Sequence, residues 1–337
     1  MEGLINVIVN RDNLNKAFEK VRKNKGAAGV DAKDIEATRQ YLKENNTQII
    51  EMIKTGKYKP QPVRRVEIPK PDGGKRLLGI PTVTDRVIQQ AVVQVLTPIL
   101  DPMFSNYSYG FRPNKSAHQA IEQARSYIED GYKFVVDIDL EKFFDRVQHD
   151  KLMSLMAKYI LCKPTLKLIR SFLNAGTMID GTFIYSKEGT PQGGPLSPLL
   201  SNVILHELDK ELEKRNHKFV RYADDCNIYV KSEKAGERVK EGVTAFIEKK
   251  LKLKVNEEKS AVGKPIARVF LGVSFYNARG VIRVYVPKKS KKRFEEKLKY
   301  ITNRNYSIDM ESRIQKINYL IQGWGNYFKI ADIQSYA

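Results

Sequence analysis

The spacing of hydrophobic residues predicts helices over much of the chain. In residues 11–25, Leu14, Phe18 and Val21 recur at the spacing of one helix face. The stretch from Asp34 to Thr55 is a second predicted helix. Further helices are predicted over residues 84–99, 116–129, 151–159, 197–215 and 235–251, and from residue 287 onward.

Strands are predicted where β-branched and aromatic residues gather between turn residues. Between Tyr58 and Pro81, prolines separate short strand-like pieces, and the sequence Pro71-Asp72-Gly73-Gly74 predicts a turn. Further strands are predicted over residues 134–140, in the two arms of 219–230, and over 253–256, 269–275 and 281–286. The chain therefore mixes helices with strands.

The stretch from Phe219 to Val230 has two apolar arms with Asp224 and Asp225 between them. Adjacent aspartates favour a tight turn, so the stretch predicts a hairpin. Its tip is either simply polar and solvated, or a site where two carboxylates hold a hard cation such as Mg²⁺.

A second pair of acids interrupts the apolar run 134–140. Asp137 and Asp139 share one face of this predicted strand. Carboxylates in an apolar strand are unfavourable unless they are paired, hydrogen-bonded or bound to metal. This run therefore strengthens the metal-site interpretation. His149, beside Asp150, is interpreted as a cap or a satisfied surface group rather than a ligand.

Composition indicates a polyanionic partner. The 337 residues suffice for roughly two domains, and 59 Lys and Arg against 39 Asp and Glu give a net charge of +20. Such a charge favours association with nucleic acid. An anionic membrane surface is the competing partner, but there is no basic amphipathic anchor, lipidation signal or long apolar run. The N-terminus does not resemble a signal peptide. The two cysteines predict a reduced, intracellular protein without a structural zinc cluster.

Two segments leave alternatives open. The hairpin between residues 58 and 81 is crowded with basic residues. These form either a solvated edge or a clamp for phosphates. In the loop 190–198, Ser197 is predicted to cap a helix that Pro198 begins. Helix capping does not explain Gln192.

Taken together, these stretches resemble a reverse transcriptase, specifically the maturase-type enzymes encoded by bacterial group II introns. The resemblance covers nearly the whole chain in the family's order. It rests on the basic hairpin, residues 108–113, 136–145, 189–202, 222–225, 253–260 and 270–272. It implies an α+β right-hand polymerase, with fingers, a palm with an antiparallel ferredoxin-like sheet, and a helical thumb.

The resemblance also implies a division of the chain. The expected parts are an N-terminal extension (1–30), fingers (31–130), a first palm segment (131–162), a fingers insertion (163–189), a second palm segment (190–287) and a thumb (288–337). Relatives usually continue into a basic DNA-binding region, so the thumb is expected to be incomplete at Ala337.

Site residues are carried over by position in the matching motifs. Asp139, Asp224 and Asp225 correspond to the catalytic carboxylates, and these three with Leu140 to the metal site. Asp137 is left out of this set. The implied dNTP-binding residues are Lys70, Arg76, Phe144, Gln192 and Lys259. The implied template–primer residues are Arg64, Arg112, Tyr222, Leu271 and Gly272.

The implied activity is RNA-templated addition of deoxynucleotides to a primer, with two Mg²⁺ ions for which Mn²⁺ could substitute. The implied partners are dNTPs, an RNA template with a DNA or RNA primer, and group II intron RNA. No membrane partner is expected, and a homodimer stays open. The expected location is a ribonucleoprotein in the bacterial cytoplasm. Two alternatives are an RNA-binding splicing factor and a host-adapted reverse transcriptase used in defence or repair.

Overall fold

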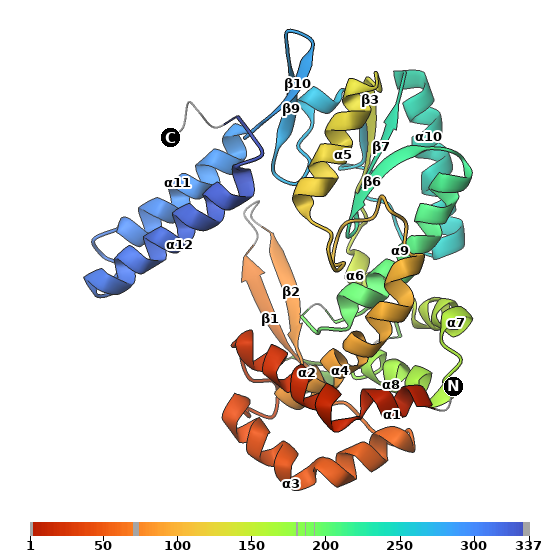
Figure 1. Ribbon diagram of the computed structural model, residues 1–337, viewed down its shortest axis with the longest axis vertical. Coiled ribbons are helices and arrows are strands. Elements are labelled where there is room, and N and C mark those ends of the chain that lie inside the picture. The colour runs from red at the N-terminus through yellow and green to blue at the C-terminus, as the bar shows by residue number, and fades with distance from the viewer. Residues whose placement is uncertain (1–2, 70–73, 180, 186, 192, 333–337) are drawn as a thin grey trace.

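The computed structural model describes residues 3–69, 74–179, 181–185, 187–191 and 193–332 (Figure 1). The predicted residues Lys70 and Gln192 therefore lie outside the described residues. Helices and strands alternate along the chain, and a pair of helices near the C-terminal end stands apart from the rest.

The N-terminal half is largely helical. A largely buried helix, α4 (Val83–Leu100), lies at its centre and contacts the three preceding helices. These are α1 (Gly3–Ile8), α2 (Arg11–Lys23) and α3 (Ile35–Lys54). Asn10 and Asp34 cap α2 and α3 through side-chain oxygens, which fixes where each helix begins. The predicted helices of this region are confirmed.

The basic hairpin belongs to a four-stranded sheet of order β2-β1-β4-β5. Its strands are β1 (Val63–Pro69), β2 (Lys75–Ile80), β4 (Thr177–Ile179) and β5 (Thr182–Ile184). β1 runs antiparallel to β2, as the sequence predicts, and parallel to β4. The sheet thus joins the hairpin to a segment that follows it by about a hundred residues.

A second sheet, which we call the palm sheet, has the antiparallel order β6-β7-β3-β8. Its strands are β6 (Lys218–Tyr222), β7 (Asp225–Val230), β3 (Phe134–Ile138) and β8 (Ala261–Gly263). Alternating side chains divide between two hydrophobic clusters, with Phe219 and Ile228 in one and Val220 and Tyr229 in the other. Both faces of this sheet are therefore covered.

Different elements cover the two faces. On the face of Phe219 and Ile228 lie α9 (Ser197–Lys214) and α10 (Glu233–Phe246). On the other face lie α5 (Ala117–Glu129) and a hairpin of β9 (Ser274–Ala278) and β10 (Val281–Tyr285). α5 lies within the range expected for the fingers, and it packs on the palm sheet. The domain boundaries themselves stay a prediction.

Short helices connect these parts. They are η1 (Asp101–Met103), α6 (Phe143–Arg146), α7 (His149–Tyr159), α8 (Lys163–Leu173), η2 (Ile247–Leu251) and η3 (Pro265–Ala267). No helix in the described ranges is both long and apolar enough to cross a lipid bilayer.

Three local predictions were wrong. Residues 253–256 form a single bridge, Val255 to Leu140, instead of a strand. The strand predicted over 269–275 begins only at Ser274, because Leu271 and Gly272 take left-handed conformations in a tight turn. Ser197 is the first residue of α9, not its cap, because its hydroxyl donates to the Pro191 carbonyl (2.7 Å).

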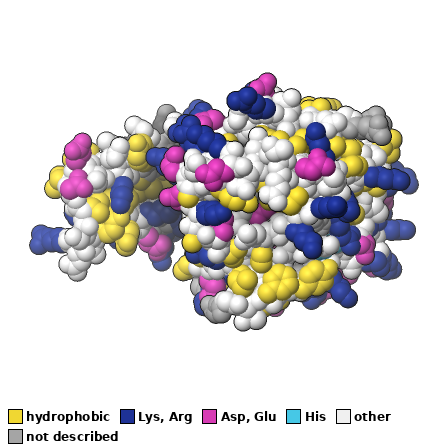
Figure 2. Space-filling model, turned by 90° about the horizontal axis from the view of Figure 1, so that it is seen from below, with side chains coloured by type: hydrophobic (Ala, Val, Ile, Leu, Met, Phe, Trp, Pro, Cys, Tyr) yellow, Lys and Arg dark blue, Asp and Glu magenta, His cyan; other side chains and the backbone are white. Residues whose placement is uncertain are grey.

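The last two described helices, α11 (Lys288–Thr302) and α12 (Met310–Phe328), form a helical hairpin. We call this pair the thumb helices (Figure 1). Phe328 is the one buried residue of the two helices, both of which lie wholly within the described ranges. Figure 2 shows this pair projecting to one side of the molecule, with basic side chains on its surface.

Candidate active site

The palm sheet gathers the predicted carboxylates. Asp137 of β3 pairs with Asn227 of β7, so continuing the register places Asp139 opposite Asp225. These acids share one face of the sheet. Asp139 and Asp224 line a cleft of about 1120 Å³. The sequence predicted that these acids belong to one site, although strand β3 and the β6–β7 hairpin are far apart in the chain.

The carboxylates influence one another electrostatically. Burial, and then the charges of Asp137, Asp224 and Asp139, raise the pKa of Asp225 to about 7. Burial raises the pKa of Asp137 to about 6, against the opposing effect of Arg268, whose guanidinium lies 3.9 Å from the Asp137 carboxylate. Asp137 therefore belongs to the same cluster, although the sequence interpretation left it outside the catalytic set.

The main chain around Asp139 is held by a neighbouring segment. The Asp139 amide donates to the Ser260 hydroxyl (3.0 Å), and the Asn256 amide donates to the Asp139 carbonyl (2.8 Å). Leu140 bridges Val255. Lys259, from the same segment, lines the cleft beside Asp139. The segment 253–260, one of those that carry the family resemblance, thus contacts Asp139 and its neighbour Leu140.

A buried arginine holds the hairpin tip. Arg221 is fully buried and donates to both oxygens of Asp209 at 2.6 Å. It also donates to the Asn202 side chain (3.1 Å) and to the carbonyl of Ala223 (2.8 Å), a residue whose φ is +58°. The sequence analysis missed this network. The available signal was a charged residue in an otherwise apolar strand arm.

The loop 108–113 packs against the same tip. The Tyr109 amide donates to the Arg221 carbonyl (2.8 Å), and the Asn202 side chain donates to the Gly110 carbonyl (2.9 Å). A methyl group at Gly110 would overlap the Ala223 main chain, so only glycine fits there. The loop and the Asp224 turn therefore form one rigid unit.

Arg112 is committed to holding this loop. Its side chain is 5% exposed and pairs with Asp101 at 2.7 Å. The guanidinium also donates to the carbonyls of Ser105 (2.5 Å) and Ser108 (2.9 Å). With its donors so occupied, this placement gives no support to the expected contact between Arg112 and template–primer.

Phe144 lies in the cleft on α6, next to the loop that leads to Gln192. The Thr190 amide donates to the Phe144 carbonyl (2.6 Å). His149 is buried, with Nε2 2.7 Å from the Gly189 carbonyl. His149 thus has a hydrogen-bond partner, as interpreted. It is, however, buried rather than on the surface, and it anchors this loop.

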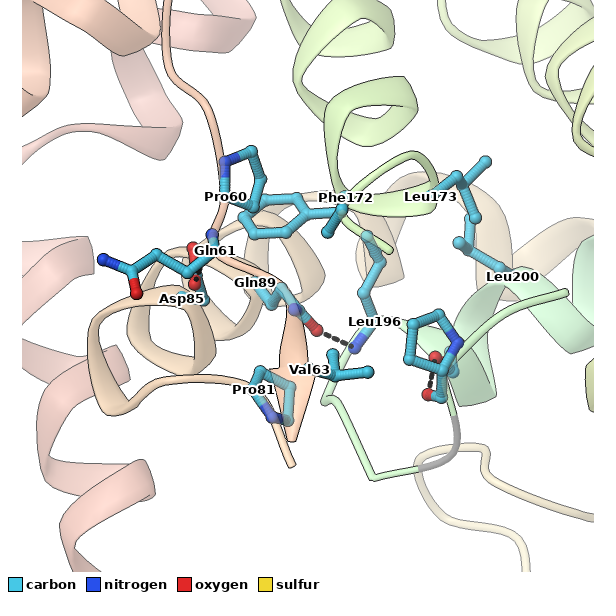
Figure 3. A pocket seen from close by; sticks show the side chains of 13 residues that line it. Pro60, Gln61, Val63, Pro81, Asp85, Gln89, Phe172, Leu173, Leu196 and Leu200 are labelled. Atoms are coloured by element: carbon cyan, nitrogen blue, oxygen red, sulfur yellow. Dashed lines mark hydrogen bonds between the residues drawn. The ribbon is translucent and has the colours of Figure 1, made fainter. Parts of the chain in front are cut away.

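The far end of that loop rests on α4 (Figure 3). The Leu196 amide donates to the Gln89 side-chain oxygen (3.4 Å), and a methyl group at Gly194 would overlap that oxygen. Around this contact lies an internal space of about 20 Å³, roughly the room one water occupies. Asp85 beside it accepts from Tyr58 (2.8 Å). The space is too small for a substrate.

The predicted hairpin residues are placed only in part. Arg64 donates to the Ala28 carbonyl (2.9 Å), which ties the hairpin to the N-terminal segment. Arg76 pairs through its main chain with Ile68 in the β1–β2 ladder, and the described structure does not extend to its side chain.

The predicted primer-side residues lie where the palm sheet meets the thumb helices. Tyr222 ends β6 opposite Asp225. The Leu271 carbonyl accepts from the Tyr327 hydroxyl (2.7 Å), and the Gly272 carbonyl accepts from Ser290 (2.8 Å). The turn at Leu271 and Gly272 is therefore fastened to both thumb helices.

The donor set fits a hard divalent cation. Carboxylates suit Mg²⁺, and a cation would offset both the burial and the neighbouring negative charges that raise the pKa of Asp225. Within the described ranges, however, no three His, Cys, Asp or Glu side chains converge on one point that could hold a metal ion. Asp139 and Asp224 thus line the cleft, but the described carboxylates do not form a closed metal cage.

Comparisons with known proteins agree with this geometry. The family model described as "Reverse transcriptase (RNA-dependent DNA polymerase)" matches residues 68–275. A second one, "Group II intron, maturase-specific domain", matches residues 291–337.

Two relatives come from bacteria. Group II intron-encoded protein LtrA of Lactococcus lactis is 33% identical over 311 residues, covering 73% of this chain and 52% of LtrA. The chain thus spans about half the length of that relative. Protein YkfC of Escherichia coli is 32% identical over 302 residues, covering 78% of this chain and 79% of YkfC.

Among solved structures, telomerase from Candida albicans, in complex with a fragment of telomeric RNA, is similar with a TM-score of 0.52. The identity is 15%, and the match covers 86% of this chain and 58% of that one, so it shows the fold alone. The predicted α+β right-hand polymerase fold is confirmed. The chain belongs to the reverse transcriptase family, among the reverse transcriptases and maturases encoded by group II introns.

Proposed function

We propose that this chain is an RNA-directed DNA polymerase that extends a primer with dNTPs, and that it binds group II intron RNA as a maturase. The observation that carries the proposal is that Asp139 and Asp224 line one large cleft, with Asp225 opposite Asp139 in the palm sheet. A solvated polar turn would not require a second strand of acids beside it.

The proposed chemistry uses two divalent ions, Mg²⁺ or in its place Mn²⁺. Asp139 and Asp224 would hold them from the cleft floor, with Asp225 behind and Leu140 adjacent. The chemistry that bound ions supply is activation of the primer 3′-hydroxyl and stabilisation of the leaving oxygen. The chain's own contribution is to fix the carboxylates in place, which Ser260 does at Asp139 and Arg221 does at the turn.

The remaining roles concern the incoming dNTP and the primer. The incoming dNTP is proposed to be bound by Lys70, Arg76, Gln192 and Lys259. The turn at Leu271 and Gly272 is proposed to support the primer, together with Arg64 and Tyr222.

Phe144 is proposed to lie under the sugar of the incoming dNTP and to exclude a 2′-hydroxyl. Its position in the cleft beside the Thr190 loop supports this role. Phe144→Val should therefore admit ribonucleotides, with a gain on the order of 100-fold relative to the parent protein. Single-nucleotide incorporation of dNTP and rNTP measures this gain. Unchanged rejection would assign the discrimination to another residue.

Primer extension tests the proposal. The purified chain should extend a DNA primer on an RNA template when Mg²⁺ and dNTPs are supplied. No extension with either Mg²⁺ or Mn²⁺, combined with tight binding of intron RNA, would instead favour the splicing-factor alternative. Comparable binding of intron RNA and an unrelated structured RNA would contradict the maturase role and favour a host-adapted reverse transcriptase.

A further inference from the structure

Phe111 is turned outward from a loop that is otherwise fixed. Its neighbour Gly110 is pressed against Ala223, and Arg112 is nearly buried among Asp101 and main-chain carbonyls. Phe111 itself is 52% exposed and lines the same cleft as Asp139 and Asp224.

This placement is energetically unfavourable for the protein alone. The φ of Phe111 is +59°, in the left-handed region that residues with a Cβ rarely adopt. Exposing the ring also forgoes the stabilisation that burial would give. Phe111 belongs to neither hydrophobic cluster formed by the described residues. The ring therefore does not serve the core.

Strained residues that a rigid surrounding enforces are concentrated at ligand-binding positions. An aromatic ring facing a nucleic-acid cleft has an evident partner in the flat face of a base. Because Gly110 touches the main chain beside Asp224, the ring stands next to the catalytic turn. A base that stacks there would lie near the reacting end of the primer–template.

We propose that Phe111 is a stacking platform for one nucleobase of the bound primer–template. The proposal rests on the polymerase function proposed above and adds a contact that positions its substrate. Stacking tolerates any base, because every base has a π-face, so the contact suits an enzyme that must copy any sequence. The base comes from either the template or the primer strand, and the experiment separates these two sources.

The experiment measures binding of a fluorescent RNA-template/DNA-primer duplex by anisotropy, without dNTPs. Phe111→Ala should weaken binding by about 5- to 100-fold, the range expected for the loss of one base–aromatic stack. Phe111→Tyr, which keeps the ring, should bind within about twofold of the parent protein. Phe183→Ala is the matched control, because Phe183 is also 52% exposed but lies on the β4–β5 hairpin.

Two readouts separate stacking from damage to the fold. Phe111→Gly removes the ring and relieves the left-handed strain, so it should melt no lower than the parent protein and still bind weakly. Its binding should decline with salt at the parent's slope, because no phosphate contact is lost.

Abasic nucleotides placed one at a time along each strand then locate the partner. One abasic position should weaken binding to the parent protein and have no further effect on Phe111→Ala. The strand that carries this position is the source of the base.

Equal binding by Phe111→Ala and the parent protein would overturn the proposal, as would an equal loss in Phe183→Ala. A parent protein that binds no primer–template at all would instead contradict the proposed polymerase function, so the two failures are distinguishable.

Discussion

The β6–β7 hairpin of the palm sheet and the thumb helices α11 and α12 are held in opposite ways. In the hairpin most side chains are buried, and Arg221 has carboxylate, amide and carbonyl partners in the interior. The thumb helices bury only Phe328 between them. The hairpin is thus fixed by burial, whereas the thumb helices present side chains to their surroundings.

The two regions also differ in charge. The cleft floor concentrates acids, while residues 288–337 hold 11 Lys and Arg against 5 Asp and Glu. Acids held rigidly suit chemistry, which depends on exact placement of charge. Mobile basic side chains on a surface suit attraction to phosphates, which tolerates many geometries. Substitutions in the two regions should therefore change different measured quantities.

The largest stability effect is expected from Asp209→Asn in the buried ion pair. It leaves the Arg221 charge inside the protein without its counterion, so the free energy of unfolding should fall by about 3 kcal/mol. As Arg221 positions the turn, kcat should fall while KM for dNTP stays near the parent value. Urea unfolding and single-nucleotide extension measure the two effects.

Glu296→Gln is the control on the thumb helices. Glu296 and Lys292 form an exposed pair at 3.9 Å, so the free energy of unfolding should not change measurably. Equal losses from both variants would remove the contrast between the two regions.

A smaller effect is expected from the pH dependence of Asp225. Its pKa rises from an ordinary value of 3.8 to about 7 in the folded protein. Between these values the folded state binds more protons than the unfolded state, so this group's contribution to stability declines as pH rises from about 4 to about 7. Asp225→Asn should remove that decline and stabilise the metal-free protein at pH 8 by on the order of 2 kcal/mol.

The same variant tests the cation. Excess Mg²⁺ should raise the melting temperature of the parent protein more than that of Asp225→Asn, because the cation relieves repulsion among the carboxylates. If stability depends on pH in the same way for the two proteins, with or without Mg²⁺, Asp225 does not contribute to this repulsion.

The predicted elements and the site differ in how far the sequence determines them. Helices such as α3 and α5 follow from local periodicity and capping, and Asp139 and Asp224 from motif residues. The contacts of Arg221 could not be predicted, because Asp209 and Asn202 reach it only when α9 packs on the palm sheet. The wrong strand over 269–275 has a related cause, since its apolar residues fill a turn fastened to the thumb helices.

The smallest effects are expected from charge removal on the thumb helices. Replacing Lys288, Lys289, Lys291 and Lys292 with Gln should flatten the salt dependence of primer–template binding, by up to about 0.9 in log–log slope for each lost phosphate contact. Replacing four basic residues of α2 should instead weaken structured RNA more than a short duplex. The α2 set is Lys16, Lys20, Arg22 and Lys23.

Binding of both RNAs at several salt concentrations, for each set of variants, measures this division. Equal losses from both sets on both RNAs would leave only non-specific attraction.

The most direct test of the account is primer extension by Asp224→Asn, with primer–template binding measured on the same preparation. The carboxylate lines the same cleft as Asp139, so extension should fall by at least about 1000-fold while affinity stays nearly unchanged. Asp150→Asn, the same change at an exposed side chain on α7, should extend normally. Extension by Asp224→Asn at a rate near that of the parent protein would contradict the assignment of the palm carboxylates as the catalytic centre.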